Sequence, residues 1–325
     1  MPKKRILSGM RPTGRLHLGN YAGALENWIR LQDEYDNFFF VADWHSLTTN
    51  PKAAFEVNEQ TQDMVIDWLS AGIKPENPIF IQSKIKKHAE LHLIFSMLIT
   101  TARLERNPTL KEQVRDLNSD TLLYGHLGYP VLQAADILMY KASVVPVGED
   151  QAPHVEITRE IARKFNSTYD EVFPEPETKL TSFARLPGLD GRKMGKSNHN
   201  FILMSDSEED IFKNVRTAVT DPEKIRRNDP GHPEICNVFA YHQKFNIAEV
   251  PQIEEDCKSG VLGCVDCKKN CATKIADFFG PHREKRAYYL NHPDEVNDII
   301  ESGNDAARKV AEATMEDVHK AMKMG

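Results

Sequence analysis

The sequence predicts an α/β protein with a parallel sheet in its first part and a mainly helical second part. Two observations support this prediction. Through the first 200 residues, short apolar runs that fit strands alternate with longer amphipathic stretches, which is typical of a parallel sheet covered by helices on both faces. Beyond about residue 200 the strand signals fade and helical signals dominate. We therefore expect two domains, 1–200 and 201–325.

Four strands are expected in the first domain, at residues 4–8, 37–42, 79–82 and 144–147. Between them, residues 53–71 and 90–104 have apolar side chains at the spacing of amphipathic helices. Ligands of such sheets bind at the carboxyl ends of the strands. The loops that follow Ser8 and Val147 are therefore expected to form a binding site.

The second domain contains signals for the start and end of helices. Ser207 followed by Glu208-Glu209-Asp210 is typical of a capped helix start. Residues 294–301 and 305–322 are predicted as two further helices, with Gly303 between them as a stop.

Composition excludes several classes of protein. A length of 325 residues with 40% hydrophobic content supports a full core. No apolar run approaches the roughly 18 residues of a membrane span, and the start lacks the apolar segment of a secretory signal, so we expect a cytoplasmic protein with no membrane contact. A net charge of -7 argues against a surface that coats nucleic acid, although residues 264–287 carry six basic and three acidic side chains.

A glycine-rich turn at residues 12–20 is the first of two stretches that fit a nucleotide site. It reads Pro-Thr-Gly-Arg-Leu-His-Leu-Gly-Asn, follows a predicted strand and precedes an amphipathic run that begins at Tyr21. Glycines let a ligand come close to the backbone, and the N–H groups at the start of a helix attract anions. The turn therefore predicts a phosphate-binding site.

The second stretch, Lys-Met-Gly-Lys-Ser at 193–197, lies in a loop that begins with Pro187-Gly188. Lys193 and Lys196 are three residues apart and can reach the phosphates of a bound triphosphate. Taken alone, such a turn also fits an ordinary solvated basic loop. Its order after the first motif favours an ATP site.

Together these stretches resemble the HIGH and KMSKS signatures of class I aminoacyl-tRNA synthetases, which read HLGN and KMGKS here. Residues 129–138 (Tyr-Pro-Val-Leu-Gln-Ala-Ala-Asp-Ile-Leu) and 147–151 (Val-Gly-Glu-Asp-Gln) narrow the resemblance to the tryptophanyl-tRNA synthetase family, over about residues 5–220. The resemblance implies a Rossmann-like catalytic domain and a helical anticodon-binding domain. It also implies ATP and Mg²⁺ as cofactors, L-tryptophan and its tRNA as partners, and a homodimer with residues 85–104 as a candidate interface.

By this resemblance His17, Asn20, Lys193 and Lys196 are the catalytic residues. Asn20 stands where the usual signature has a second His, so it keeps a donor without a titratable proton, and Gly195 replaces a common Ser. The alternative for His17 is a loop histidine that caps a helix. Lys111 is a further phosphate candidate. The implied ATP-binding set is Arg11, Pro12, Thr13, Gly19, Asn20, Gly148, Glu149, Asp150, Leu186, Lys193, Met194, Gly195, Lys196 and Ser197.

Asp136 is the candidate specificity residue. It lies in a nearly all-apolar stretch, 131–140, that predicts a buried helix, and a buried carboxylate must find a partner. By resemblance that partner is the indole N–H of tryptophan; the alternative is a structural ion pair with a core-facing Arg. An amino acid without this N–H would leave the carboxylate unpaired. The other implied tryptophan-binding residues, of which the apolar ones also fit plain core, are Tyr129, Gln133, Val145, Val147 and Gln151.

All five cysteines lie in the second domain. In a cytoplasmic protein such clustering favours a metal site over disulfides. Some bacterial members of the family carry a 4Fe-4S cluster on similarly spaced cysteines, which implies Cys236, Cys257, Cys264 and Cys267 as ligands, next to cations available to tRNA. Zn²⁺ and unliganded thiols are the alternatives, and Cys271 is either spare or a replacement for Cys236.

Three other functions fit parts of this pattern. The sister tyrosyl-tRNA synthetases share the catalytic motifs, and small-molecule nucleotidylyltransferases share a turn like the first motif. A non-catalytic relative that binds tRNA or a cluster is the third. Retention of His17, Lys193, Lys196 and Asp136 together argues against the non-catalytic alternative.

Overall fold

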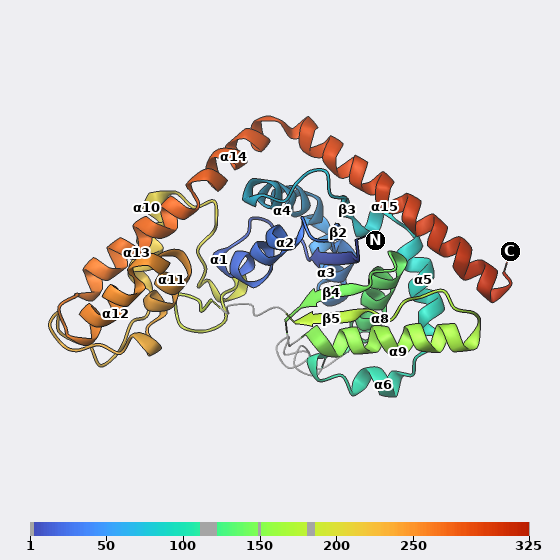
Figure 1. The fold of residues 1–325 in the computed structure, drawn as a ribbon, viewed down its shortest axis with the longest axis horizontal. Coiled ribbons are helices and arrows are strands. Elements are labelled where there is room, and N and C mark those ends of the chain that lie inside the picture. Colours follow the sequence, from blue (N-terminus) through green and yellow to red (C-terminus); the bar gives the residue numbers. More distant parts are fainter. Residues whose placement is uncertain (1–2, 111–121, 149–150, 181–185, 325) are drawn as a thin grey trace.

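The computed structural model describes residues 3–110, 122–148, 151–180 and 186–324. At its centre is a parallel five-stranded sheet with the strand order β3-β2-β1-β4-β5 (Figure 1). The strands are β1 Arg5–Met10, β2 Asp36–Val41, β3 Ile79–Ile81, β4 Val144–Val147 and β5 Glu177–Leu180. The four predicted strands are confirmed to within two residues at each end. The sequence did not predict β5 because it is an edge strand and carries mostly polar side chains.

Helices surround the sheet. Those of the first part are α1 Leu18–Asn20, the π-helical turn Tyr21–Leu25, α2 Glu26–Leu31, α3 Asp43–Thr49, α4 Val57–Ala71, α5 Lys87–Ser96, α6 Thr101–Glu105, α8 Tyr124–Met139 and α9 Ala152–Thr168. The later helices are α10 Glu208–Thr217, α11 Asn237–Phe245, α12 Val250–Lys258, α13 Cys264–Phe278, α14 Gly280–Asn291 and α15 Pro293–Met322. Short 3₁₀ turns cover Pro51–Phe55, Gln82–Lys84, Lys196–Asn198, Pro233–Ile235 and Ile247–Glu249. Among the described helices, none is both long and apolar enough to cross a bilayer.

The helix predictions are partly confirmed. Ser207 caps α10, since its side chain accepts a hydrogen bond from Asp210 N. The single helix expected over residues 90–104 is wrong: the chain forms α5 and α6 there, and the side chain of Thr100 caps the second. The helix expected over 53–71 begins instead as a 3₁₀ turn at Pro51 and becomes α4 at Val57.

Two hydrophobic clusters occupy the opposite faces of the sheet. Strand β2 divides its phenylalanines between them, with Phe39 in one cluster and Phe38 and Phe40 in the other, as the alternation of side chains along a strand requires. The Phe39 cluster includes α2 and α4 and continues into α10, α11 and α13. The other cluster contains side chains of α5, α8, α9 and the second half of α15.

The predicted stop at Gly303 is wrong, because residues 293–322 form the single helix α15. A Cβ atom at Gly303 would lie 2.0 Å from the carbonyl oxygen of Ile79. The side chain of the next residue, Asn304, accepts a hydrogen bond of 3.0 Å from Ile81 N. Glycine here permits the helix to touch β3 and cover the edge of the sheet.

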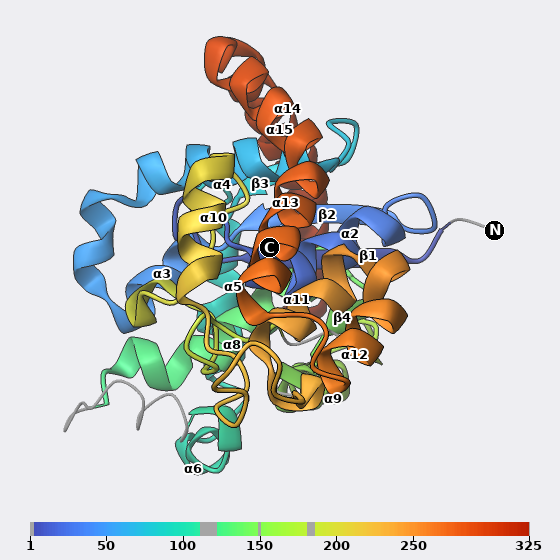
Figure 2. The same ribbon diagram turned by 90° about the vertical axis from the view of Figure 1, so that its left-hand side faces the viewer.

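The C-terminal helices return to the sheet. The group α10–α13 lies at one end of the molecule, and α14 and α15 run back from it over the part that holds the sheet (Figure 1), while Figure 2 views this group end-on. Helix α14 packs on α4, and α15 packs on β3, α5 and α8. The division into domains 1–200 and 201–325 stays a prediction, but the last two helices share their cores with the first part.

We predict that Gly303→Ala destabilises the protein by about 2–3 kcal/mol, because a methyl group has no room against the backbone of β3. Urea unfolding would measure this change. Gly280→Ala is the matched control, since a Cβ at that helical position meets nothing within 4 Å. Equal stability of the two variants would show that α15 does not approach β3 this closely.

Candidate active site

The two signature stretches lie against each other although about 180 residues separate them. Leu18 N donates to Ile202 O at 2.9 Å, and Met204 N donates to Leu16 O at 2.9 Å, so the segment after the second stretch pairs with the first. Gly19 N lies 3.2 Å from the sulfur of Met194. The ammonium of Lys196 donates to the carbonyl of Thr13. Both motifs therefore meet beyond the carboxyl end of β1, as the sequence predicted.

His17 caps the helix that follows it. Its Nδ1 accepts from Asn20 N at 3.2 Å, while Asn20 Oδ1 accepts from His17 N at 3.0 Å. The capping role that the sequence left as an alternative is therefore present. It is compatible with a role toward phosphate, because an accepting Nδ1 assigns the ring proton to Nε2.

The imidazole of His17 is neutral at pH 7. Burial and the nearby charge of Lys196 lower its pKa to about 4. Burial also lowers the pKa of Lys196 itself. The site therefore holds a neutral N–H donor beside an ammonium, an arrangement that attracts an anion without a proton transfer.

The second signature loop is ordered by Asn200. Its Oδ1 accepts from Gly195 N at 2.9 Å, and its Nδ2 donates to Lys193 O at 3.1 Å and to Asp190 at 2.6 Å. Lys193 and Ser197 are exposed, Gly195 and Lys196 are half-buried, and Met194 is buried. The loop is thus a fixed support for its two lysines, unlike the freely solvated loop of the alternative reading.

The other predicted ATP-site residues lie in several places. Arg11 Nη1 reaches Thr49 Oγ1 at 3.4 Å, and burial lowers the pKa of its guanidinium. Pro12 and Leu186 are buried, Thr13 is exposed, and Gly148 follows β4. Glu149, Asp150 and Lys111 lie outside the described residues. Their roles stay predictions.

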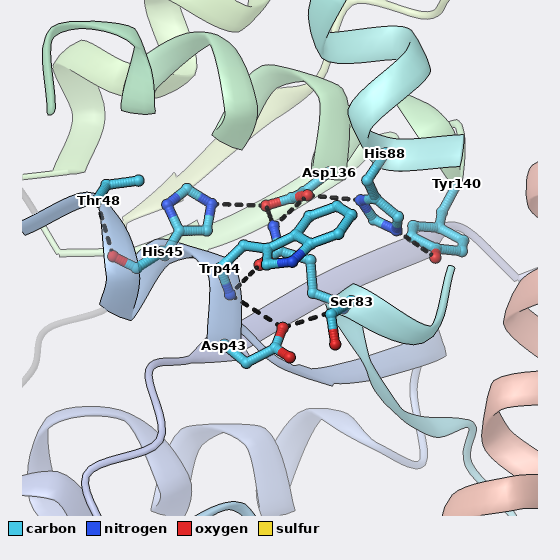
Figure 3. A network of polar contacts seen from close by, with 9 residues as sticks. Asp43, Trp44, His45, Thr48, Ser83, His88, Asp136 and Tyr140 are labelled. Carbon is cyan, nitrogen blue, oxygen red and sulfur yellow. Dashed lines mark hydrogen bonds and ion pairs between the residues drawn. The ribbon is translucent and has the colours of Figure 1, made fainter. Parts of the chain in front are cut away.

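Asp136 is completely buried in α8. Its Oδ2 lies 2.7 Å from His45 Nε2 and its Oδ1 lies 2.6 Å from His88 Nδ1, with the two imidazoles on opposite sides of the carboxylate (Figure 3). Gln82 Nε2 donates to both oxygens, at 2.8 and 2.9 Å. Among the described residues its ion-pair partners are His45 and His88, and no arginine pairs with it there.

The carboxylate of Asp136 stays ionised despite its burial. Burial pushes its pKa upward, but hydrogen bonds and charge from His45 and His88 outweigh that effect and hold the pKa at about 2. These donors are themselves held in place: His88 Nε2 lies 2.7 Å from Tyr140 Oη, and Gln82 Oε1 accepts from Trp44 N at 3.1 Å. The result is a fixed, buried acceptor.

Sequence reasoning missed His45, Gln82 and His88. A signal for two of them existed, because His45 follows the end of β2 by four residues and Gln82 directly follows β3. Side chains at the carboxyl ends of adjacent parallel strands converge, so the rule applied to Ser8 and Val147 would have found both. His88 lies on α5, and no local pattern marks it.

Of the remaining tryptophan-site candidates, Tyr129 contacts this network. The ring of Tyr129 is buried and lies edge-on to His45 at 6.1 Å between ring centroids. Its hydroxyl contacts His154 Nε2. Val145 is buried, and Gln133, Val147 and Gln151 are half-buried. The contacts of Tyr129 place its ring beside the Asp136 network, and the tryptophan-binding roles of all five residues stay predictions.

The cysteines are free thiols, four of them half-buried and Cys271 buried. Burial raises the pKa of Cys267 to about 12, and the proximity of Cys236, Cys257 and Cys264 contributes to that rise. These four side chains therefore face a common region beside α11–α13. As they lie in the described structure, no three His, Cys, Asp or Glu side chains form a metal-binding arrangement.

Comparisons with known proteins agree with this geometry. The family model described as tRNA synthetases class I (W and Y) matches residues 2–280. The tryptophan–tRNA ligase of Thermotoga maritima is 51% identical over 98% of this chain and 99% of its own length, and that of Aquifex aeolicus is 41% identical over 98% and 100%. The crystal structure of tryptophanyl-tRNA synthetase from Campylobacter jejuni with ADP and tryptophan has a TM-score of 0.88 at 32% identity, covering 98% of this chain and 99% of that one.

We predict that His17 titrates near pH 4, and ring-nitrogen NMR of the isotope-labelled protein, assigned with His17→Asn, would measure it. Because the folded pKa lies below the unfolded value of about 6.5, the contribution of His17 to stability is complete above that value. It is lost as the pH falls through about 4. The His17→Asn variant should lack this part of the pH dependence, and a midpoint near 6.5 in the folded protein would contradict the burial argument.

Proposed function

This chain belongs to the class I tRNA synthetases for tryptophan and tyrosine, and from its site we propose how the individual residues serve its reaction. It is a tryptophan–tRNA ligase: it converts L-tryptophan and ATP to tryptophanyl-adenylate and pyrophosphate, and transfers the amino acid to the 3′ end of its tRNA. The buried Asp136 network is the observation in the site that best fits an indole as substrate.

In the first step the carboxylate of tryptophan attacks the α-phosphorus of ATP. A bond forms between carboxylate oxygen and phosphorus while the bond to the β-phosphate oxygen breaks, and pyrophosphate leaves with the electron pair. The nucleophile is already ionised, so the site needs to position it and to stabilise charge rather than remove a proton. The neutral His17 and the amide Asn20 suit that requirement.

His17 and the two lysines divide the phosphate contacts. We assign Nε2–H of His17 to an α-phosphate oxygen, since its Nδ1 is occupied by the cap. Lys193 and Lys196 would neutralise the departing pyrophosphate from the loop that Asn200 orders. Bound Mg²⁺ would share that neutralisation at the phosphates of ATP.

Asp136 selects the amino acid. An ionised carboxylate offers about four lone-pair sites, and three donor groups share them here, since His45 and His88 each contact one oxygen and Gln82 Nε2 contacts both. We propose that the indole N–H of tryptophan takes the place of one of the two shared Gln82 contacts. A substrate without that donor would leave a buried charge incompletely paired, which discriminates more strongly than shape alone.

The comparisons argue against some of the alternative functions. The family match, and the tryptophan–tRNA ligases that align with nearly the whole chain, argue against a nucleotidylyltransferase. They also favour tryptophan over tyrosine within the shared family. The exchange assay described below separates an active ligase from a non-catalytic relative.

We propose that the helices after residue 200 bind the anticodon part of the tRNA. The cationic patch is smaller than the sequence suggested, because Lys268 donates to Arg216 O and Lys274 pairs with Glu249 at 2.6 Å. Lys269 and Lys285 remain exposed and are the better candidates for phosphate contacts. A local cluster of this kind, and not overall charge, would carry the RNA binding.

The four half-buried cysteines are proposed to hold a 4Fe-4S cluster, with Zn²⁺ as the alternative. Their thiols influence one another's pKa, and ligation would require their deprotonation together with a small rearrangement. Cys236 is the N-cap residue of α11, Cys257 lies in α12, and Cys264 and Cys267 lie in α13, so a bound group would link the three helices. It would supply structural support for the RNA-binding end.

A homodimer and a cytoplasmic location complete the proposal. Leu93 and Met97, on and just after α5, are 63% and 64% exposed within the segment 85–104 that the sequence suggested as an interface. Exposed large apolar side chains next to the tryptophan network fit an interface with a second copy of this chain. We place the protein in the cytoplasm because its reaction needs free tRNA and ATP.

We predict that Asp136→Ala lowers kcat/KM for tryptophan-dependent ATP–pyrophosphate exchange by about 100-fold or more, because the indole loses its acceptor. The assay compares tryptophan, tyrosine and no amino acid. Tyr140→Phe is the control, since it removes only the hydroxyl behind His88 and should cost a few-fold at most. Exchange that is absent with every amino acid in the unaltered protein would favour the non-catalytic relative.

We predict that anaerobically purified protein shows the visible absorbance of an iron–sulfur cluster, and that Cys264→Ser loses it. The same variant should charge tRNA poorly while largely keeping tryptophan-dependent exchange, since Cys264 lies at the start of α13 and belongs to neither signature loop. Cys271→Ala is the matched control and should keep the metal. A metal content of about one zinc per chain would favour the Zn²⁺ alternative over the iron–sulfur cluster. Equal loss of exchange and of tRNA charging would refute the division of roles.

A further inference from the structure

A buried ion pair joins the C-terminal helices to the helix beneath the first signature loop. Arg286 of α14 is 6% exposed, and its Nη1 donates to Oδ1 of Asp67 in α4 at 2.8 Å. The same guanidinium contacts the side chain of Asp63 and donates to its carbonyl at 3.2 Å. Asp67 is completely buried. The catalytic assignments above use none of these three residues.

The second oxygen of Asp67 reaches the signature loop. Oδ2 accepts a hydrogen bond of 2.6 Å from the backbone N–H of Leu16, the residue directly before His17. The carbonyl of Leu16 accepts from Met204 N at 2.9 Å, in the segment that follows the second signature. The backbone that carries His17 is therefore held on one side by Asp67 and on the other by the second motif.

The charges of this cluster also influence Lys196 in the second signature. Burial is the main influence on the pKa of Lys196 and lowers it, while the carboxylates of Asp67 and Asp63 partly offset that shift. Without Arg286, the buried carboxylate of Asp67 would face the partly exposed carboxylate of Asp63 one helical turn away, and would keep His282, whose Nε2 lies 3.3 Å from Oδ1, as a neighbour. Asp67 would then reorient, and its hydrogen bond to Leu16 would weaken.

We propose that Arg286 is a positioning residue for amino-acid activation, which holds Asp67 against the N–H of Leu16 and so orients His17 toward ATP. This inference rests on the role assigned to His17 above. It makes α14 part of the catalytic unit although its sequence lies far from both signatures. The planar fork of arginine suits this task, because it contacts both carboxylates together with a backbone carbonyl.

The first test is steady-state exchange with Arg286→Met. We expect kcat to fall about 10–100-fold, as a small misplacement of a catalytic group does, with KM for tryptophan changed less than about two-fold because the Asp136 network is separate. Glu284→Gln is the matched control: it removes an exposed charge two positions earlier in the same helix and should leave kcat unchanged. Equal losses in both variants would overturn the proposal.

A double-mutant cycle with His17→Ala separates positioning from general destabilisation. If Arg286 acts through His17, Arg286→Met costs little further activity once His17 is absent. Multiplicative losses would mean that Arg286 has only a structural role. Should His17→Ala alone leave kcat unchanged, the assigned role of His17 fails first and this proposal falls with it.

If Arg286→Met does not fold, Arg286→Lys takes its place in the double-mutant cycle with His17→Ala. It retains the charge but loses the planar fork, so we expect a smaller fall in kcat and the same dependence on His17. A fall in kcat of the same size for Arg286→Lys with and without His17→Ala would overturn the proposal in the same way. Circular dichroism of each variant verifies that the compared proteins are folded.

Discussion

The pairing of the first signature loop with the segment after the second is the constraint on which the active site depends. Hydrogen bonds between Leu16–Leu18 and Ile202–Met204 join two parts of the chain that are distant in sequence. They bring Lys196 to Thr13 and place Met194 against Gly19. Without this backbone pairing, the imidazole and the two ammonium groups would have no fixed geometry for a single phosphate chain.

Two fully buried carboxylates organise the opposite sides of the site. Asp136 is surrounded by two imidazoles and an amide, and Asp67 by a guanidinium and a backbone N–H. Burying a charge is costly unless it is fully paired, so each carboxylate fixes the elements that supply its partners. Asp136 joins α3, the turn after β3 and α5, where we propose that the amino acid binds, while Asp67 joins α14 to the first signature loop.

The C-terminal helices are part of this organisation. Gly303 lets α15 press against β3, Asn304 binds the backbone of that strand, and Arg286 reaches α4. The strand β3 in turn ends at Gln82, a partner of Asp136. Helix α15, which follows the group α10–α14, thus packs on the strand that leads to Gln82 and so connects the C-terminal helices to the Asp136 network.

The sequence by itself determined the parallel sheet, the first signature loop after β1, the burial of Asp136 and the cap at Ser207, because each depends on local spacing or on short motifs. It did not determine the partners of Asp136, the unbroken helix through Gly303 or the contact of Arg286 with Asp67. Those depend on which surfaces meet after folding. In the sequence Gly303 fits the end of a helix, whereas in the structure a Cβ atom at this position would lie 2.0 Å from the carbonyl oxygen of Ile79 in β3. Only the tertiary structure decided them, since hydrogen bonds between residues some 50 to 220 positions apart leave no local pattern in the chain.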